Sequence, residues 1–150
     1  LWNGRKSYTD EFRAADVFEK ACGGGVGQGC YNLGTFHLQG WAVSTPHLGR
    51  AAELFGEACK RGTVWGCLSL GKIHEEGLGG VYVPQDGEKA ASLYRQACGE
   101  GVAEGCFALG MLYFKGQAVT GNKLSATTLF EQSCAEGYQK ACFAVAQLEE

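Results

Sequence analysis

Long apolar runs, basic clusters and prolines are all scarce in this 150-residue sequence. No stretch approaches the ~20 consecutive apolar residues that a membrane-spanning helix needs, so membrane insertion is not expected. A formal net charge of −3, with no run rich in lysine or arginine, gives no electrostatic basis for binding nucleic acid. There are only two prolines, and the 24 glycines recur at fixed positions, which excludes a flexible low-complexity tract.

Cysteine, by contrast, is abundant and regularly spaced. The eight cysteines form four pairs with seven residues between the members of each pair. The pairs recur about every 37 residues, a period that indicates stacked supersecondary units rather than one globular core. The sequence therefore predicts a repeat array with hairpins at about 10–40, 49–77, 86–116 and 123–150, preceded at 1–9 by the remnant of another repeat.

Apolar residues at i, i+3, i+4 and i+7 predict that each hairpin consists of two α-helices. Asp10 is a candidate N-cap for the first helix. A glycine three residues after the first cysteine of each pair is expected to end the first helix in a left-handed conformation. Gly34, Gly71 and Gly110 lie in the middle of second helices, where glycine costs roughly 1 kcal/mol relative to alanine. We therefore expect a neighbouring helix to approach closely there, and this constraint to relax at Ala146.

Four in-phase copies share one pattern, A-A-x-L-F-x-x-A-C-x-x-G-x-x-x-G-C-x-x-L-G, which stands complete from Ala51 to Gly71. This pattern resembles the Sel-1-like repeat family, in particular the cysteine-rich branch typified by the Helicobacter cysteine-rich proteins. The resemblance covers nearly the whole chain. It implies an all-α fold, an α-solenoid of about four stacked helix-turn-helix repeats related to tetratricopeptide arrays. Departures from the family pattern, expected to affect only local packing, are Thr127, Ser133, Ala141, His37 and His74.

Two antiparallel helices joined by a short turn bring residues eight positions apart to facing sites, so each hairpin is expected to be stapled by its own disulfide. Disulfides at this density indicate an oxidising compartment, first the bacterial periplasm or secretion and second the mitochondrial intermembrane space. The alternative is a cytosolic protein with eight reduced cysteines acting as small apolar core residues. The expected pairs are Cys22–Cys30, Cys59–Cys67, Cys98–Cys106 and Cys134–Cys142.

Sequence signals for metal, cofactor or catalysis are few, and neither a metal nor a cofactor is expected. No two cysteines have the C-x₂₋₄-C spacing of zinc sites, and His37 and His74 occupy equivalent helical positions where packing with a satisfied ring nitrogen is expected. Ser69 and Lys72 match the S-x-x-K motif of penicillin-interacting enzymes, but no S-D-N or K-T-G element accompanies them. Because some cysteine-rich family members are described as penicillin-binding or weakly β-lactamase-like, that activity is the alternative to a non-enzymatic role.

The second helices carry the predicted binding surface. Residues one, three, four and six positions after the second cysteine are assigned to the core in every copy, which leaves those at +2, +5 and +9 on the open face. This helix usually lines the concave side of such superhelices, so we expect a protein- or peptide-binding scaffold of the cell envelope or secreted space. Asn32 also resembles, in its G-C-Y-N-L-G context, an asparagine that related arrays aim at a peptide. The expected binding residues, with Ala108 among them on the same face, are Asn32, Thr35, Gln39, Ser69, Lys72, Glu76, Met111 and Lys115.

Overall fold

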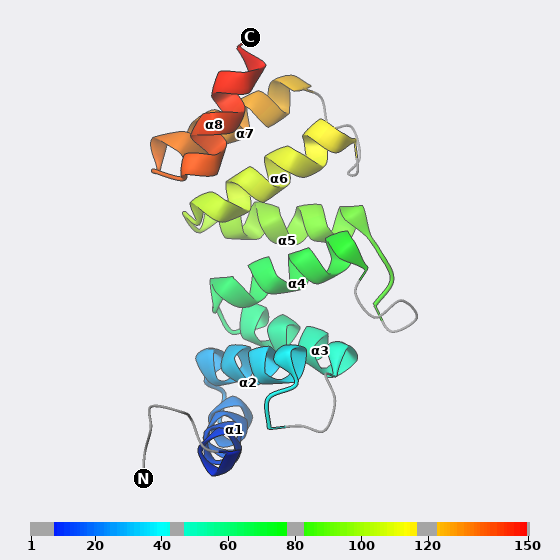
Figure 1. Ribbon diagram of the computed structural model, residues 1–150, viewed down its shortest axis with the longest axis vertical. Coiled ribbons are helices and arrows are strands. Elements are labelled where there is room, and N and C mark those ends of the chain that lie inside the picture. Colours follow the sequence, from blue (N-terminus) through cyan, green and yellow to red (C-terminus); the bar gives the residue numbers. More distant parts are fainter. Residues whose placement is uncertain (1–7, 43–46, 78–82, 117–122, 150) are drawn as a thin grey trace.

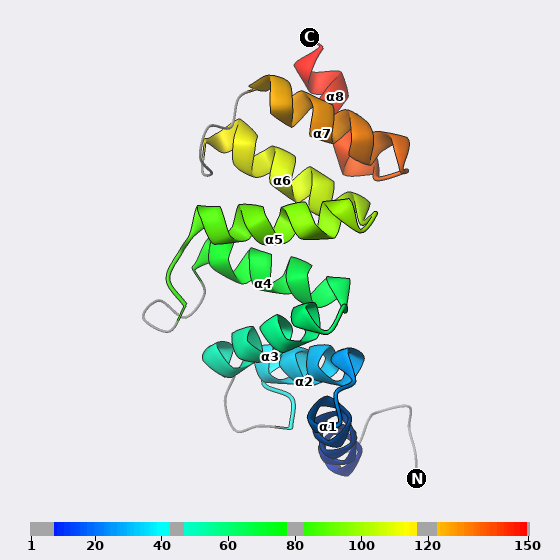
Figure 2. The same ribbon diagram turned by 180° about the vertical axis from the view of Figure 1, so that it is seen from behind.

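The computed structural model describes residues 8–42, 47–77, 83–116 and 123–149, so most of the predicted remnant at 1–9 lies outside the described residues. Within these ranges the chain forms α-helices and no strand, and the helices are stacked along the long axis with α1 and α8 at opposite ends (Figures 1 and 2). Each helix packs against its neighbours in the sequence. The predicted all-α solenoid is confirmed. Its helices are α1 Tyr8–Gly23, α2 Gly27–Gln39, α3 Leu48–Lys60, α4 Val64–Glu76, α5 Gly87–Gly99, α6 Ala103–Lys115, α7 Lys123–Ala135 and α8 Gln139–Leu148.

The helix ends are formed largely by glycine, as predicted. The short turn between α3 and α4 passes through Gly62, whose φ is 87°. Residues that have a Cβ rarely adopt this left-handed backbone conformation. Gly77 ends α4 in the same way at φ 65°. The prediction for Asp10 is wrong, because α1 begins at Tyr8 and Asp10 lies in its first turn. A carboxylate there still favours the helix, since it faces the positive end of the helix dipole.

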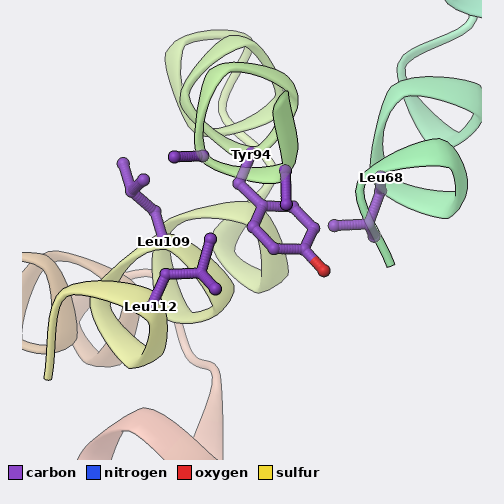
Figure 3. Close-up of a cluster of buried hydrophobic side chains, with 6 residues drawn as sticks. Leu68, Tyr94, Leu109 and Leu112 are labelled. Carbon is purple, nitrogen blue, oxygen red and sulfur yellow. The ribbon is translucent and has the colours of Figure 1, made fainter. Parts of the chain in front are cut away.

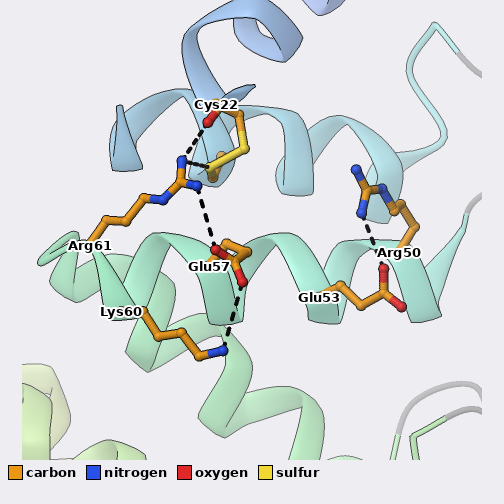
Figure 4. Close-up of polar contacts among 7 residues, drawn as sticks. Cys22, Arg50, Glu53, Glu57, Lys60 and Arg61 are labelled. Atoms are coloured by element: carbon orange, nitrogen blue, oxygen red, sulfur yellow. Dashed lines mark hydrogen bonds and ion pairs between the residues drawn. A yellow bond between two sulfur atoms is a disulfide. The ribbon is translucent and has the colours of Figure 1, made fainter. Parts of the chain in front are cut away.

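Four disulfides staple the successive helix pairs. Their Cα–Cα distances are 4.5, 4.7, 4.5 and 4.6 Å, each between cysteines eight positions apart. The first bridge is also tied to the next helix pair (Figure 4). Arg61, at the end of α3, donates a hydrogen bond to the carbonyl oxygen of Cys22, and one of its guanidinium nitrogens lies 3.4 Å from Cys30 Sγ. Glu57 forms ion pairs with Lys60, at 3.7 Å, and with Arg61, at 3.6 Å (Figure 4).

A glycine in the middle of α2, α4 and α6 makes room for an aromatic ring of the helix that follows. A Cβ added to any one of these three glycines would lie much closer to that ring than ordinary van der Waals contact allows. The predicted close approach is confirmed, and its partner is the first helix of the next hairpin. The pairs and their closest Cβ–ring distances are Gly34 with Phe55 at 2.8 Å, Gly71 with Tyr94 at 2.6 Å and Gly110 with Phe130 at 2.7 Å.

Tyr94 shows how one of these interfaces is built (Figure 3). Its fully buried ring lies between α4 and α6, in a cluster with Leu68, Leu109 and Leu112. Its hydroxyl donates a hydrogen bond to Glu75 Oε2 at 2.6 Å. Burial, together with this carboxylate, raises the pKa of Tyr94, so the phenol remains a protonated donor. The interface thus combines apolar burial with a satisfied polar group.

The fourth hairpin departs from the other three in two ways. Ser133, which replaces alanine, is fully buried and donates from Oγ to the carbonyl oxygen of Ala103 at 2.8 Å, so the extra hydroxyl joins α7 to α6. The expectation of a buried apolar stripe in every copy is wrong for α8, where Phe143 is 66% exposed. No described helix packs on that face, and Ala146 lies exposed on it, which agrees with the predicted relaxation.

Candidate functional site

An open cavity of about 370 Å³ lies between α4, α6 and the start of α8. We call it the α4–α6–α8 groove. Five residues of the predicted binding face line it, namely Lys72 and Glu76 from α4 and Ala108, Met111 and Lys115 from α6. Residues from successive hairpins therefore meet in one hollow, as the shared helical face predicts.

Several lining residues were not predicted. Glu104 and Lys140 lie two positions before their second cysteine, and the positions −2, +2, +5 and +9 form one continuous helical stripe. The same spacing rule, extended by one turn, would have identified both. Tyr94 and Tyr138 come from outside the second helices, so only the packing of neighbouring hairpins places them here. The other unpredicted lining residues are Glu75 and Phe107.

The charges of the groove are only partly paired. Lys72 Nζ lies 2.8 Å from Glu104 Oε1, an ion pair that joins α4 to α6. Glu75 accepts the hydrogen bond from Tyr94. Lys115 and Lys140 have no carboxylate partner among the residues that the structure describes. Among the described residues the groove therefore offers two ammonium groups and one carboxylate, Glu76, without an ion-pair partner, beside apolar side chains. The excess of free ammonium groups suits a ligand that carries both a carboxylate and an apolar group.

The remaining predicted residues lie outside this groove. Asn32 Oδ1 accepts a hydrogen bond from Gln28 Nε2 at 3.0 Å, and Thr35 Oγ1 donates to the carbonyl oxygen of Tyr31 at 3.1 Å. With Gln39 they occupy on α2 the stripe that Lys72 and Glu76 occupy on α4. Trp65, at the −2 position of α4, is 48% exposed. The stripe of candidate residues thus continues from the groove toward the N-terminal hairpins.

The side chains of Ser69 and Lys72 are not arranged as a catalytic pair. In S-x-x-K enzymes the lysine must contact the serine hydroxyl to activate it. Here the Lys72 ammonium donates a hydrogen bond to Glu104, and none joins Lys72 to Ser69, although the structure describes both residues. Ser69 is half-buried and does not line the groove. Nothing in this geometry favours the alternative β-lactam activity.

The two histidines meet the expectation of a satisfied ring nitrogen differently. The ring of His74 forms a hydrogen bond with the backbone of Pro84, as expected. Nδ1 of both His37 and His74 is buried without a hydrogen-bond partner among the described residues. At the equivalent position of α6, the longer Tyr113 side chain carries its hydroxyl out to Arg95 Nη2 at 2.8 Å. The imidazoles of His37 and His74 are shorter than this side chain, so Nδ1 remains buried in the protein interior. No group of three potential metal-binding side chains occurs in the described ranges.

Lowering the pH from 7 to 5 is expected to destabilise the fold partly through these two histidines. Burial, with Arg50 and His47 nearby, lowers the pKa of His37, and burial with Lys89 nearby lowers the pKa of His74. Once the pH is below about 6.5, the ordinary pKa of histidine, the unfolded chain therefore binds more protons at these two side chains than the folded protein does. The free energy of unfolding therefore falls as the pH drops through that value. Thermal unfolding at a series of pH values measures the effect. The variant His37→Tyr/His74→Tyr, which copies Tyr113, should show a weaker dependence, and an unchanged slope would contradict this account.

Two comparisons with known proteins, one with family models and one with solved structures, agree with this architecture. The family model of the Sel1 repeat matches residues 27–63, 66–102 and 103–138. Each matched unit begins with a second helix, so the Cys59–Cys67 and Cys98–Cys106 disulfides join neighbouring units. The comparison with curated proteins returns no match. No described helix has both the length and the apolar character needed to cross a membrane.

Solved structures of bacterial proteins have the same fold. The protective antigen c5321 of uropathogenic Escherichia coli, described as displaying an SLR fold, is 26% identical with a TM-score of 0.80, over 92% of this chain and 29% of that protein. This chain therefore spans less than a third of that relative. Helicobacter pylori cysteine rich protein B is 30% identical with a TM-score of 0.68, over 95% and 99% of the two chains. A Sel1 repeat protein from Oxalobacter formigenes, 22% identical with a TM-score of 0.75 over 87% and 96%, shares the fold.

Proposed function

Because the chain belongs to the Sel1 repeat family, we propose that it is a protein- or peptide-binding scaffold of the cell envelope or secreted space. This repeat is generally a non-enzymatic scaffold for protein interaction, which is the role its stacked surfaces suit. Four disulfides support an oxidising location, the periplasm or outside the cell, because cytosolic thiols are kept reduced.

The proposed binding surface is the concave side formed by the second helices, centred on the α4–α6–α8 groove. The observation that carries this assignment is the convergence of Lys72, Glu76, Met111 and Lys115 on one hollow, since they were selected by helical position alone. The proposed ligand is an extended peptide segment that carries an acidic group beside an apolar side chain. Lys115 and Lys140 would attract the carboxylate, and Phe107 with Met111 would contact the apolar side chain.

Peptides selected from a displayed random library against the immobilised protein are expected to be acidic and to bind less tightly as salt is raised. Lys115→Glu/Lys140→Glu should lower the affinity for such a peptide by about tenfold or more, because the attraction between the lysines and the acidic peptide becomes repulsion. Asn32→Ala and Lys72→Glu test whether the surface extends along the stripe. Binding is measured by calorimetry, with the melting temperature confirming that each variant is folded.

Glu131→Lys/Glu136→Lys is the control, because both residues are exposed, near the end of α7, and outside the groove. It should leave binding of the selected peptides unchanged. If this pair of changes weakens binding while the groove variants bind as the original protein does, the working face has been assigned to the wrong side.

A further inference from the structure

A second cavity of about 350 Å³ lies away from the groove, where α1, α2 and α3 meet. Its walls include Phe12, Asp16 and Glu19 of α1, Phe36 of α2 and Trp41 just after α2. None of these residues lines the α4–α6–α8 groove. The proposed scaffold role makes no use of this cavity.

The aromatic part of the cavity is held in a defined geometry. The rings of Phe36 and Trp41 meet edge to face with centroids 5.5 Å apart, and the ring of Phe18 supports Phe36 from the other side at 5.3 Å. The backbone N–H of Trp41 donates to the carbonyl oxygen of Phe36 at 2.9 Å, just after the left-handed Gly40 that ends α2. Trp41 nevertheless remains 45% exposed. A ligand would meet an indole face that is already positioned, which reduces the entropic cost of binding.

The charges around these rings are mainly negative. Asp16 and Glu19 border the cavity, and an adjoining hollow that shares Phe36 and Trp41 is bordered by Asp10 and Glu11. The one arginine on the cavity wall, Arg50, already forms a 3.1 Å ion pair with Glu53 (Figure 4). His37, also in the wall, adds no positive charge at neutral pH, because burial lowers its pKa.

We propose that this cavity binds an organic cation on a short apolar stem, a primary ammonium or guanidinium group such as the side chain of lysine or arginine carries. The faces of Trp41 and Phe36 would attract the cation through their ring quadrupoles. Asp16 and Glu19 would supply the compensating charge. The apolar side chains of Ala15 and Leu33, which also line the cavity, would contact the stem.

Two probes of this chemistry distinguish its sources: n-butylammonium for a free amine, and lysine blocked at both ends for a side chain within a peptide. Pentanoate, with a similar stem and the opposite charge, is the control. We expect dissociation constants on the order of millimolar for the cations, with a shift of the Trp41 indole N–H resonance, and no shift with pentanoate. Binding of blocked lysine alone would identify a peptide side chain, and equal binding of both cations would identify the free amine as sufficient.

Charge variants test the carboxylates. Asp16→Asn/Glu19→Gln should weaken cation binding by about tenfold, whereas Glu131→Gln/Glu136→Gln changes the net charge equally and should not. Trp41→Leu should also abolish binding, followed through the backbone amide resonances of α1 and α2 because this change removes the indole reporter, with the melting temperature checking that the variant is folded. Equal shifts with pentanoate, an unmoved Trp41 resonance, or equal losses in the two charge variants would overturn the proposal. None of these outcomes involves the groove, so the proposed scaffold function is judged separately.

Discussion

Gly71→Ala is expected to destabilise the protein by about 2 kcal/mol, although alanine favours a helix by roughly 1 kcal/mol over glycine. The new Cβ would lie 2.6 Å from Cε1 and 2.9 Å from Cδ1 of the Tyr94 ring. That ring cannot move aside easily, because it is fully buried and its hydroxyl is bonded to Glu75. Overpacking of this kind forces a backbone shift between α4 and α5. Urea unfolding of the two proteins measures the loss.

Gly99→Ala is the matched control, since Gly99 is the last residue of α5 and an added Cβ would meet nothing within 4 Å. It should be neutral or slightly stabilising. The double variant Gly71→Ala/Tyr94→Leu should lose less than the sum of its single changes, because the smaller side chain relieves the clash. Equal effects of the two glycine substitutions would show that the close approach at Gly71 does not limit stability.

Reduction of all four disulfides is expected to unfold the protein at room temperature. Each bridge closes a loop of eight residues, which is worth about 2.5 kcal/mol on the chain-entropy model. Four such contributions amount to about 10 kcal/mol, which is as large as the 5 to 15 kcal/mol of net stability that is typical of a whole domain. Far-ultraviolet circular dichroism during titration with a phosphine reductant would follow the loss of helix.

A single missing bridge should have a local effect. Cys59→Ala/Cys67→Ala is expected to cost about 2 to 3 kcal/mol, and hydrogen exchange should rise first in α3 and α4 because repeat stability is roughly a sum of local terms. A reduced protein that unfolds at the same urea concentration as the oxidised one would contradict the prediction for all four bridges. Uniform exchange across all helices of the paired variant would contradict the local one.

Features that depend on residues near one another in the chain can be predicted from the sequence alone. The helix pairs follow from a 3.6-residue apolar period, the disulfide partners from an eight-residue separation across a short turn, and the helix ends from glycines at fixed places. The close approach at Gly34, Gly71 and Gly110 was predictable because glycine is unfavourable inside a helix unless a neighbour requires it. The first three features arise within one hairpin, so the spacing of the residues predicts them. The glycines predict that some neighbour approaches closely, but the neighbour itself lies in the next hairpin and is not identified by the spacing.

Three-dimensional packing of the helices sets the contacts between hairpins. It placed Tyr94 against Gly71, brought Tyr138 of one hairpin to Lys72 of another, and left Nδ1 of His37 buried without a partner. The cavity beside Trp41 likewise depends on how α1 lies against α2 and α3. These arrangements depend on the small rotation from each repeat to the next, which sets distances across the solenoid. That rotation is set by packing of whole helix faces, and no single spacing in the sequence encodes it.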